Sequence, residues 1–83
     1  MKYRKKPVII EALQWTGNNV DEIYNFAKEA VTYNIMGFEE LMISTLEGIM
    51  HAPVGNYIIK GIQGEYYSCD PNIFEETYEK IED

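Results

Sequence analysis

The sequence predicts an α+β fold, in which an antiparallel sheet of four to five strands is packed with two helices. Two consecutive β-hairpins, within residues 41–52 and 57–69, and an N-terminal strand are expected to supply the sheet. The second helix is expected at the C-terminal end. A chain of 83 residues buries a small core, so residues 1–83 are expected to form a single small domain.

The second hairpin and the helix after it carry the most consistent local signals. Residues 57–62 and 65–69 are rich in tyrosine and isoleucine and are separated by Gln63-Gly64, which predicts two strands with a tight turn. A two-residue turn would place Lys60 opposite Tyr67 in the sheet, and a bulge of one residue would swap the two faces. Asp70 followed by Pro71 predicts an N-cap and a first helical position. The inner stripe of this helix is expected to consist of Ile73, Phe74, Thr77, Tyr78 and Ile81.

The first hairpin is predicted from a glycine between two apolar runs. Residues 41–46 and 49–52 are expected to pair across Glu47-Gly48, because glycine readily adopts the positive φ that a two-residue turn requires. The face expected to enter the core contains Leu41, Ile43, Met50 and Ala52.

The N-terminal half is expected to contain a strand, a helix and a short strand. Residues 8–15 are apolar on both faces, which predicts an inner strand or one that is covered by a helix. Asn19 precedes a helical pattern over residues 20–30, and Glu22 has the spacing of a capping box. Residues 31–35 are rich enough in β-forming side chains to predict a short strand.

Charge is unevenly distributed along the chain. The formal net charge is −7, yet Lys2, Arg4, Lys5 and Lys6 lie within the first six residues. From Pro7 onward there are 14 acidic and three basic residues, a net charge of 3 − 14 = −11. An acidic body repels phosphate, so direct binding of DNA or RNA is disfavoured. A basic partner surface would suit it, which favours a host protein over a small molecule, and a homodimer would bury further apolar surface.

Cysteine and hydropathy patterns predict a location in the cytoplasm. Cys69 is the single cysteine, which fits a reducing compartment and excludes an intrachain disulfide. No apolar run approaches the ~18 residues of a transmembrane helix, so no membrane association is expected.

The sequence offers few groups for catalysis or metal binding. His51 is the single histidine, and a metal usually needs three or four ligands. Cys69 precedes a helix N-terminus, which can favour a thiolate, but Asp70 opposes that charge. A Cys69–His51 pair stays open as an alternative if the two hairpins are adjacent. We therefore expect no catalytic residue, no cofactor and no metal, and we predict that the protein is not an enzyme.

Two sets of residues are candidates for binding. Aromatic rings with one cation could hold a nucleotide by stacking, and this first set consists of Trp15, Tyr57, Lys60, Tyr66 and Tyr67. Acidic residues at helical spacing could imitate DNA phosphates for a basic host protein, and this second set consists of Glu75, Glu79 and Asp83. The structural alternatives are cross-strand packing for the aromatic set and a solvated helix face for the acidic set.

Several segments of the chain resemble a family of small phage and prophage proteins. The matching residues are Met1-Lys2-Tyr3-Arg4-Lys5-Lys6-Pro7-Val8, Glu11-Ala12, Gln14-Trp15-Thr16-Gly17, Leu41-Met42-Ile43, Thr45-Leu46-Glu47-Gly48 and the block of residues 53–79. Residues 20–40 depart most from the pattern. The resemblance implies a phage or prophage gene product in the cytoplasm of a bacterial host, and it implies no catalytic residues.

Together these observations favour a small acidic phage or prophage accessory protein that acts by binding a host component, as a counter-defence factor or a regulatory inhibitor. One alternative is a small-ligand binder that sequesters a nucleotide signal through the aromatic residues and Lys60. Another alternative is a purely structural phage protein.

Overall fold

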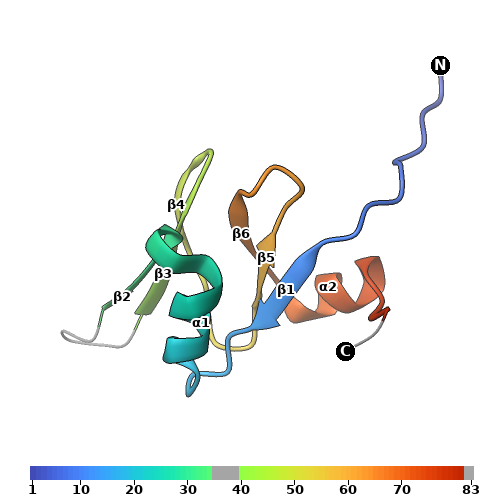
Figure 1. Cartoon of the computed structure of the whole chain (residues 1–83). Helices are drawn as coiled ribbons and strands as arrows, with labels where there is room; N and C mark the ends of the chain where they lie inside the picture. Colours follow the sequence, from blue (N-terminus) through green and yellow to red (C-terminus); the bar gives the residue numbers. More distant parts are fainter. Residues whose placement is uncertain (35–39, 82–83) are drawn as a thin grey trace.

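The structure of the chain is a computed structural model that describes residues 1–34 and 40–81 (Figure 1). Within these ranges, two α-helices and six strands form two separate antiparallel sheets, with strand orders β1-β5-β6 and β2-β3-β4. The predicted α+β class is confirmed. The single sheet of four to five strands is wrong, because the two predicted hairpins lie in different sheets.

The first sheet is built around the second predicted hairpin. Its central strand β5 (Tyr57–Lys60) pairs with β1 (Glu11–Gln14) on one side and with β6 (Tyr66–Cys69) on the other. The β5–β6 register is shifted by one residue from the predicted one, so that Lys60 lies opposite Tyr66. The cause is a longer loop, closed by a 2.7 Å hydrogen bond from the Gly61 amide to the Glu65 carbonyl. This shift moves Tyr66 and Tyr67 to the faces opposite to those expected.

The second sheet adds a strand to the first predicted hairpin. Strand β3 (Glu40–Thr45) lies between β2 (Val31–Asn34) and β4 (Gly48–His51). The short strand predicted for residues 31–35 is confirmed through position 34, and position 35 lies outside the described residues. The hairpin turn is Leu46-Glu47 and not Glu47-Gly48. Gly48 has a φ of +122° and begins β4 opposite Thr45, whose hydroxyl donates a 2.6 Å hydrogen bond to the Gly48 carbonyl.

Helix α1 (Val20–Ala27) is followed directly by the 3₁₀ helix η1 (Lys28–Ala30). The predicted capping box is wrong, because the side chain of Asn19 makes no cap hydrogen bond to the helix. Its Oδ1 accepts from the Thr16 amide at 2.9 Å, and its Nδ2 donates to the Gln14 carbonyl at 2.8 Å. Asn19 therefore holds the start of α1 to the end of β1.

The N-terminal strand is shorter than predicted and lies at an edge. Residues 8–10 directly precede β1 but are outside the sheet, and the N-terminal segment leads away from the body (Figure 1). Of the two alternatives expected for residues 8–15, an inner strand or one covered by a helix, the inner strand is therefore wrong for the single chain. Residues 1–9 are exposed.

A turn between β4 and β5 explains why the chain forms two sheets. The Asn56 amide donates to the Pro53 carbonyl at 3.0 Å, and Gly55 has a φ of +103°, which a glycine adopts with little strain. The same turn is fastened to β1, because the Trp15 amide donates to the Asn56 carbonyl and the Gly55 amide donates to the Trp15 carbonyl. These bonds bring the chain after β4 alongside β1, so that β5 starts a new sheet.

One hydrophobic core joins the two sheets and α1. Its buried members are Trp15, Ile23, Ala27, Val31, Leu41, Ile43, Ala52 and Ile58. The predicted core face of the first hairpin is thus largely correct, although Met50 is exposed. Trp15 is only 3% exposed and packs edge-to-face against Tyr33, with ring centroids 5.5 Å apart. None of the helices in the described part of the chain is long and apolar enough to cross a membrane.

Helix α2 (Pro71–Thr77) begins at the predicted cap. Asp70 Oδ1 accepts hydrogen bonds from the Asn72 amide at 2.8 Å and from the Ile73 amide at 3.3 Å. We expect Asp70→Ala to lower the free energy of unfolding by about 1 kcal/mol, because it leaves these amides without their side-chain acceptor. Urea denaturation measures this loss. Asp70→Asn keeps an acceptor and is the matched control, and a loss as large as that of alanine would contradict the capping role.

Candidate functional site

An open groove lies between the N-terminal segment and α2, on the face of the β1-β5-β6 sheet that points away from the shared core. Its volume is about 790 Å³, and we call it the α2 groove. One wall is formed by residues 8–10, and the opposite wall is formed by α2 and residues 78–81. The sheet contributes Ala12 and Tyr57 to the floor.

Three aromatic rings line the α2 groove, opposite the aliphatic side chains of residues 8–10. Side chains alternate along β5, so Tyr57 and Ile59 point toward α2 while Ile58 enters the shared core. The ring of Tyr57 stacks on Phe74, with centroids 3.8 Å apart and planes inclined by 9°. Phe74 in turn contacts Tyr78 at 5.0 Å between centroids. This stack attaches α2 to the sheet and leaves an aromatic surface along the groove.

Acidic side chains border the aromatic surface. The Tyr57 hydroxyl donates a 3.3 Å hydrogen bond to Glu75 Oε2. Burial raises the pKa of Tyr57, and the neighbouring charge of Glu75 raises it further. Glu79 and Lys80 also line the groove. The α2 groove therefore combines aromatic side chains with two carboxylates and one ammonium group.

The acidic residues predicted for partner binding are partly brought together. Glu75 and Glu79 both line the α2 groove, whereas Asp83 lies outside the described residues. They do not form the expected stripe on one helix, because α2 ends at Thr77 and Tyr78 is extended, with φ −124° and ψ 153°. The predicted inner stripe of α2 is also only partly correct, since Ile73 and Ile81 are exposed.

The five residues predicted to hold a nucleotide do not share one cavity. Tyr57 and Tyr67 point to the α2 face, while Lys60 and Tyr66 point to the opposite face of the same sheet. Trp15 is buried in the core. The one-residue shift of the β5–β6 register is the physical reason for this separation.

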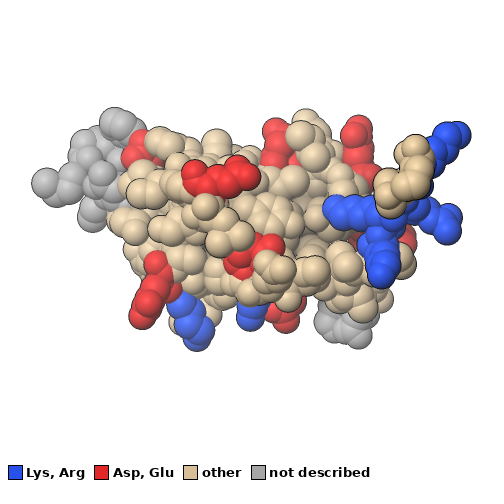
Figure 2. Space-filling view, turned by 90° about the horizontal axis from the view of Figure 1, so that it is seen from above, with Lys and Arg blue, Asp and Glu red and all other residues tan. Residues whose placement is uncertain are grey.

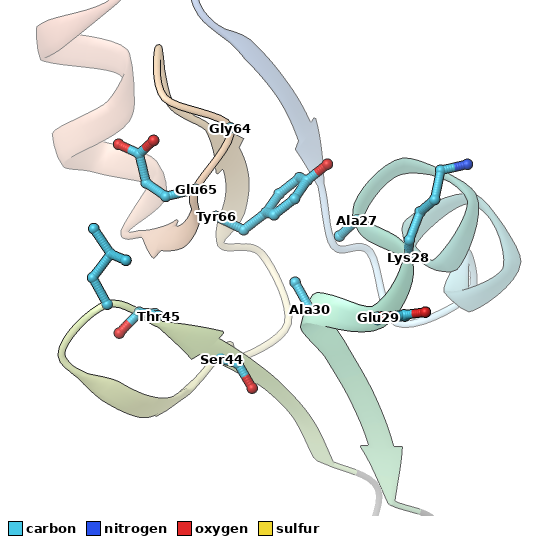
Figure 3. A pocket seen from close by; sticks show the side chains of 10 residues that line it. Ala27, Lys28, Glu29, Ala30, Ser44, Thr45, Gly64, Glu65 and Tyr66 are labelled. Atoms are coloured by element: carbon cyan, nitrogen blue, oxygen red, sulfur yellow. The ribbon is translucent and has the colours of Figure 1, made fainter.

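Tyr66 lies at a second, shallower hollow of about 540 Å³ between η1 and the tips of the two hairpins (Figure 3). Its ring extends across the hollow toward Ala27. The Tyr66 hydroxyl donates a 3.0 Å hydrogen bond to the Phe26 carbonyl, and the two rings meet edge-to-face at 5.8 Å. Tyr66 thus holds the second hairpin to α1, and its hydroxyl is engaged in that contact.

His51 and Cys69 belong to different sheets. The imidazole of His51 is on β4, where Nδ1 lies 3.6 Å from Glu40 Oε2 and the side chain is 64% exposed. Cys69 is half-buried on β6, and burial, followed by the charge of Asp70, raises the pKa of its thiol. Across residues 1–34 and 40–81, no three histidine, cysteine or acidic side chains gather in a way that could hold a metal ion.

The charges occupy different parts of the surface. In Figure 2 the basic side chains gather mainly at one end of the molecule, where the N-terminal arm (residues 1–6) projects, and the acidic side chains are spread over the body.

Comparisons of the chain with protein-family models, with curated proteins and with solved structures find no match.

The sequence pattern indicates the aromatic wall of the α2 groove but not its aliphatic wall. Phe74 and Tyr78 have the i, i+4 spacing of an inward stripe, and this spacing does place them against the sheet. Residues 8–10 gave no such signal, because their pattern is that of a paired strand. Their position beside α2 depends on β1 beginning only at Glu11, which local sequence does not encode.

Proposed function

We propose that the protein is a non-catalytic accessory factor of the phage or prophage type, which acts by binding a host protein. The α2 groove is the proposed docking site, and the partner segment is basic with apolar side chains. The observation that supports this most directly is the position of Glu75 and Glu79 beside the stacked rings of Tyr57 and Phe74.

The chemistry of the groove suits lysine and arginine side chains. Their aliphatic stems can lie on aromatic surface while their charged ends reach a carboxylate. The net charge of −11 over residues 7–83 adds a long-range attraction for a basic partner. The same charges disfavour a nucleic acid or a free phosphate at this place.

Nucleotide sequestration is supported less well. Tyr57 and Phe74 are already in stacking contact at 3.8 Å, so the space between the rings cannot accept a base. Lys60 and Tyr66 point away from the groove. A phosphate bound near Lys80 would also meet the charges of Glu75 and Glu79.

A charge-reversal pair tests the proposal. Immobilised protein is expected to capture a host protein, and Glu75→Lys with Glu79→Lys is expected to abolish this capture without lowering the melting temperature. The matched control is Glu29→Lys with Glu47→Lys, which makes the same charge change away from the groove, where both side chains are exposed. Capture that survives the groove reversal, or that is lost equally in the control, would contradict the proposal. A rise in melting temperature with cyclic dinucleotides or ADP-ribose derivatives would instead support the nucleotide alternative.

A further inference from the structure

Strand β1 has a free edge that continues into an exposed apolar segment. It is the terminal strand of its sheet and only four residues long. The residues before it are β-branched and poorly buried, with Val8 44% exposed and Ile9 76% exposed. An edge of this kind presents unpaired backbone groups on which another strand can form.

The hydrogen bonds of β1 identify which backbone groups face outward. The amide and carbonyl of Trp15 both bond to the turn that precedes β5, at 2.8 and 2.7 Å. Because the direction of these groups alternates along an antiparallel strand, Glu11 and Leu13 also face β5, and Ala12 and Gln14 face outward. The same alternation, continued through the extended segment before β1, gives Val8 and Ile10 the outward direction as well. At the far end, the outward carbonyl of Gln14 accepts from Asn19 Nδ2. Within residues 1–34 and 40–81, no backbone hydrogen bond engages the outward groups of residues 8–12.

We propose that these outward groups pair with the same edge of a second copy of the chain. The available window, residues 8–12, is symmetric about Ile10, so an antiparallel pairing places Ile10 opposite Ile10 and Val8 opposite Ala12. The result is a continuous six-stranded sheet with the order β6-β5-β1-β1-β5-β6. Pro7 is odd-numbered, so its missing N–H faces away from the partner and no bond of the ladder is lost.

Charge favours this register. Glu11 falls opposite Ile9, whereas a pairing centred on Glu11 would set two carboxylates against each other. The basic arm of each copy then runs past residues 14–18 of the other copy, toward the start of its α1. The first turn of α1 carries Asp21 and Glu22, both exposed. The arm of one copy therefore approaches acidic side chains of the other.

The dimer also accounts for the pattern of residues 8–15. Val8, Ile9 and Ile10 are β-branched and favour a strand, and pairing two β1 edges makes residues 8–12 part of a paired strand inside a sheet. The two-fold axis is perpendicular to the sheet, so both α2 grooves lie on the same side. The pairing stands independently of the partner proposed for the groove.

Proline substitutions test the edge directly. Light scattering of the wild-type chain is expected to give about twice the 9.7 kDa mass of one chain. Ile10→Pro removes an outward N–H at the centre of the pairing and should yield the monomer mass. Ile9→Pro removes an N–H that faces the other way, and this control should remain a dimer. A wild-type monomer at all concentrations, or a dimer that resists Ile10→Pro, would overturn the proposal.

Cross-linking tests the register. In a Cys69→Ser background, Ile10→Cys places two thiols in a pair whose Cα atoms are expected about 5.5 Å apart, which suits a disulfide. Oxidation should join this variant into a covalent dimer, while Ile9→Cys should stay largely unlinked. Equal cross-linking at both positions would exclude the register. Glu75→Lys with Glu79→Lys should remain dimeric, so failure of the dimer and failure of the groove proposal are separate results.

Discussion

Replacing Ile58 with alanine is expected to lower the free energy of unfolding by about 2–5 kcal/mol. Ile58 is fully buried in the central strand of its sheet, and its side chain belongs to the core that joins both sheets and α1. Alanine would remove apolar contacts and leave a cavity that the sheet cannot close. A folded chain of 83 residues has a total stability of roughly 4–12 kcal/mol, so this one change removes a large share of it.

Urea denaturation followed by the fluorescence of Trp15 measures the effect, since Trp15 lies in the same core. The matched control is Ile49→Ala on β4, where the side chain is 73% exposed and the expected loss is below about 0.5 kcal/mol. Far-UV circular dichroism should give the same midpoint, because one shared core predicts one cooperative transition. Equal losses in the two variants would show that the core is not where the structure places it.

Local sequence predicted the elements whose cause is local. The Asp70-Pro71 pair determines the start of α2 through a side-chain acceptor and a fixed φ, and both act within three residues. The strands of the two hairpins were predicted for the same reason, from apolar runs between glycines. The short strand before residue 35 followed from β-branched and aromatic residues alone.

The division into two sheets could not be predicted in this way. It depends on the pairing of β1 with β5, which are more than 40 residues apart, and on the hydrogen bonds between Trp15 and the turn before β5. Composition does not indicate which strands will meet over such a distance. The length of the β5–β6 loop was equally ambiguous, because Gly61 and Gly64 can each begin or end a turn.

The unknown length of the β5–β6 loop limited how much of the candidate site could be predicted from the sequence. A shift of one residue exchanges the faces of Tyr66 and Tyr67, and it separates residues that were expected to act together. The acidic residues Glu75 and Glu79 do lie together, as predicted. They are close in sequence, so both line the groove even though α2 ends between them. Neighbours along the chain tolerate an error in an element boundary, whereas neighbours across a sheet do not.

Stability is expected to fall as pH rises from about 10 to about 12, because of Tyr67. Burial raises the pKa of Tyr67 to about 12, with further contributions from its hydrogen bond to Tyr78 and from the charge of Glu65. The usual value is 10, so above that pH the unfolded chain releases this proton while the folded chain retains it. The folded state then binds more protons, and its stability decreases with pH. At about 1.36 kcal/mol per pKa unit, the change from 10 to about 12 sets a limit of about 2.7 kcal/mol. The expected loss is about 1–2 kcal/mol, because solvent screens the partly exposed ring.

Urea denaturation at a series of pH values between about 9 and 11.5 measures this dependence. Tyr67→Phe removes the titrating hydroxyl and should flatten the decline, although Tyr57 and Cys69, whose pKa values burial also raises, leave a smaller slope of the same sign. Tyr3→Phe is the matched control, because Tyr3 is exposed and its loss should not alter the profile. A decline that is unchanged in Tyr67→Phe, or that disappears in Tyr3→Phe, would show that Tyr67 does not carry the effect.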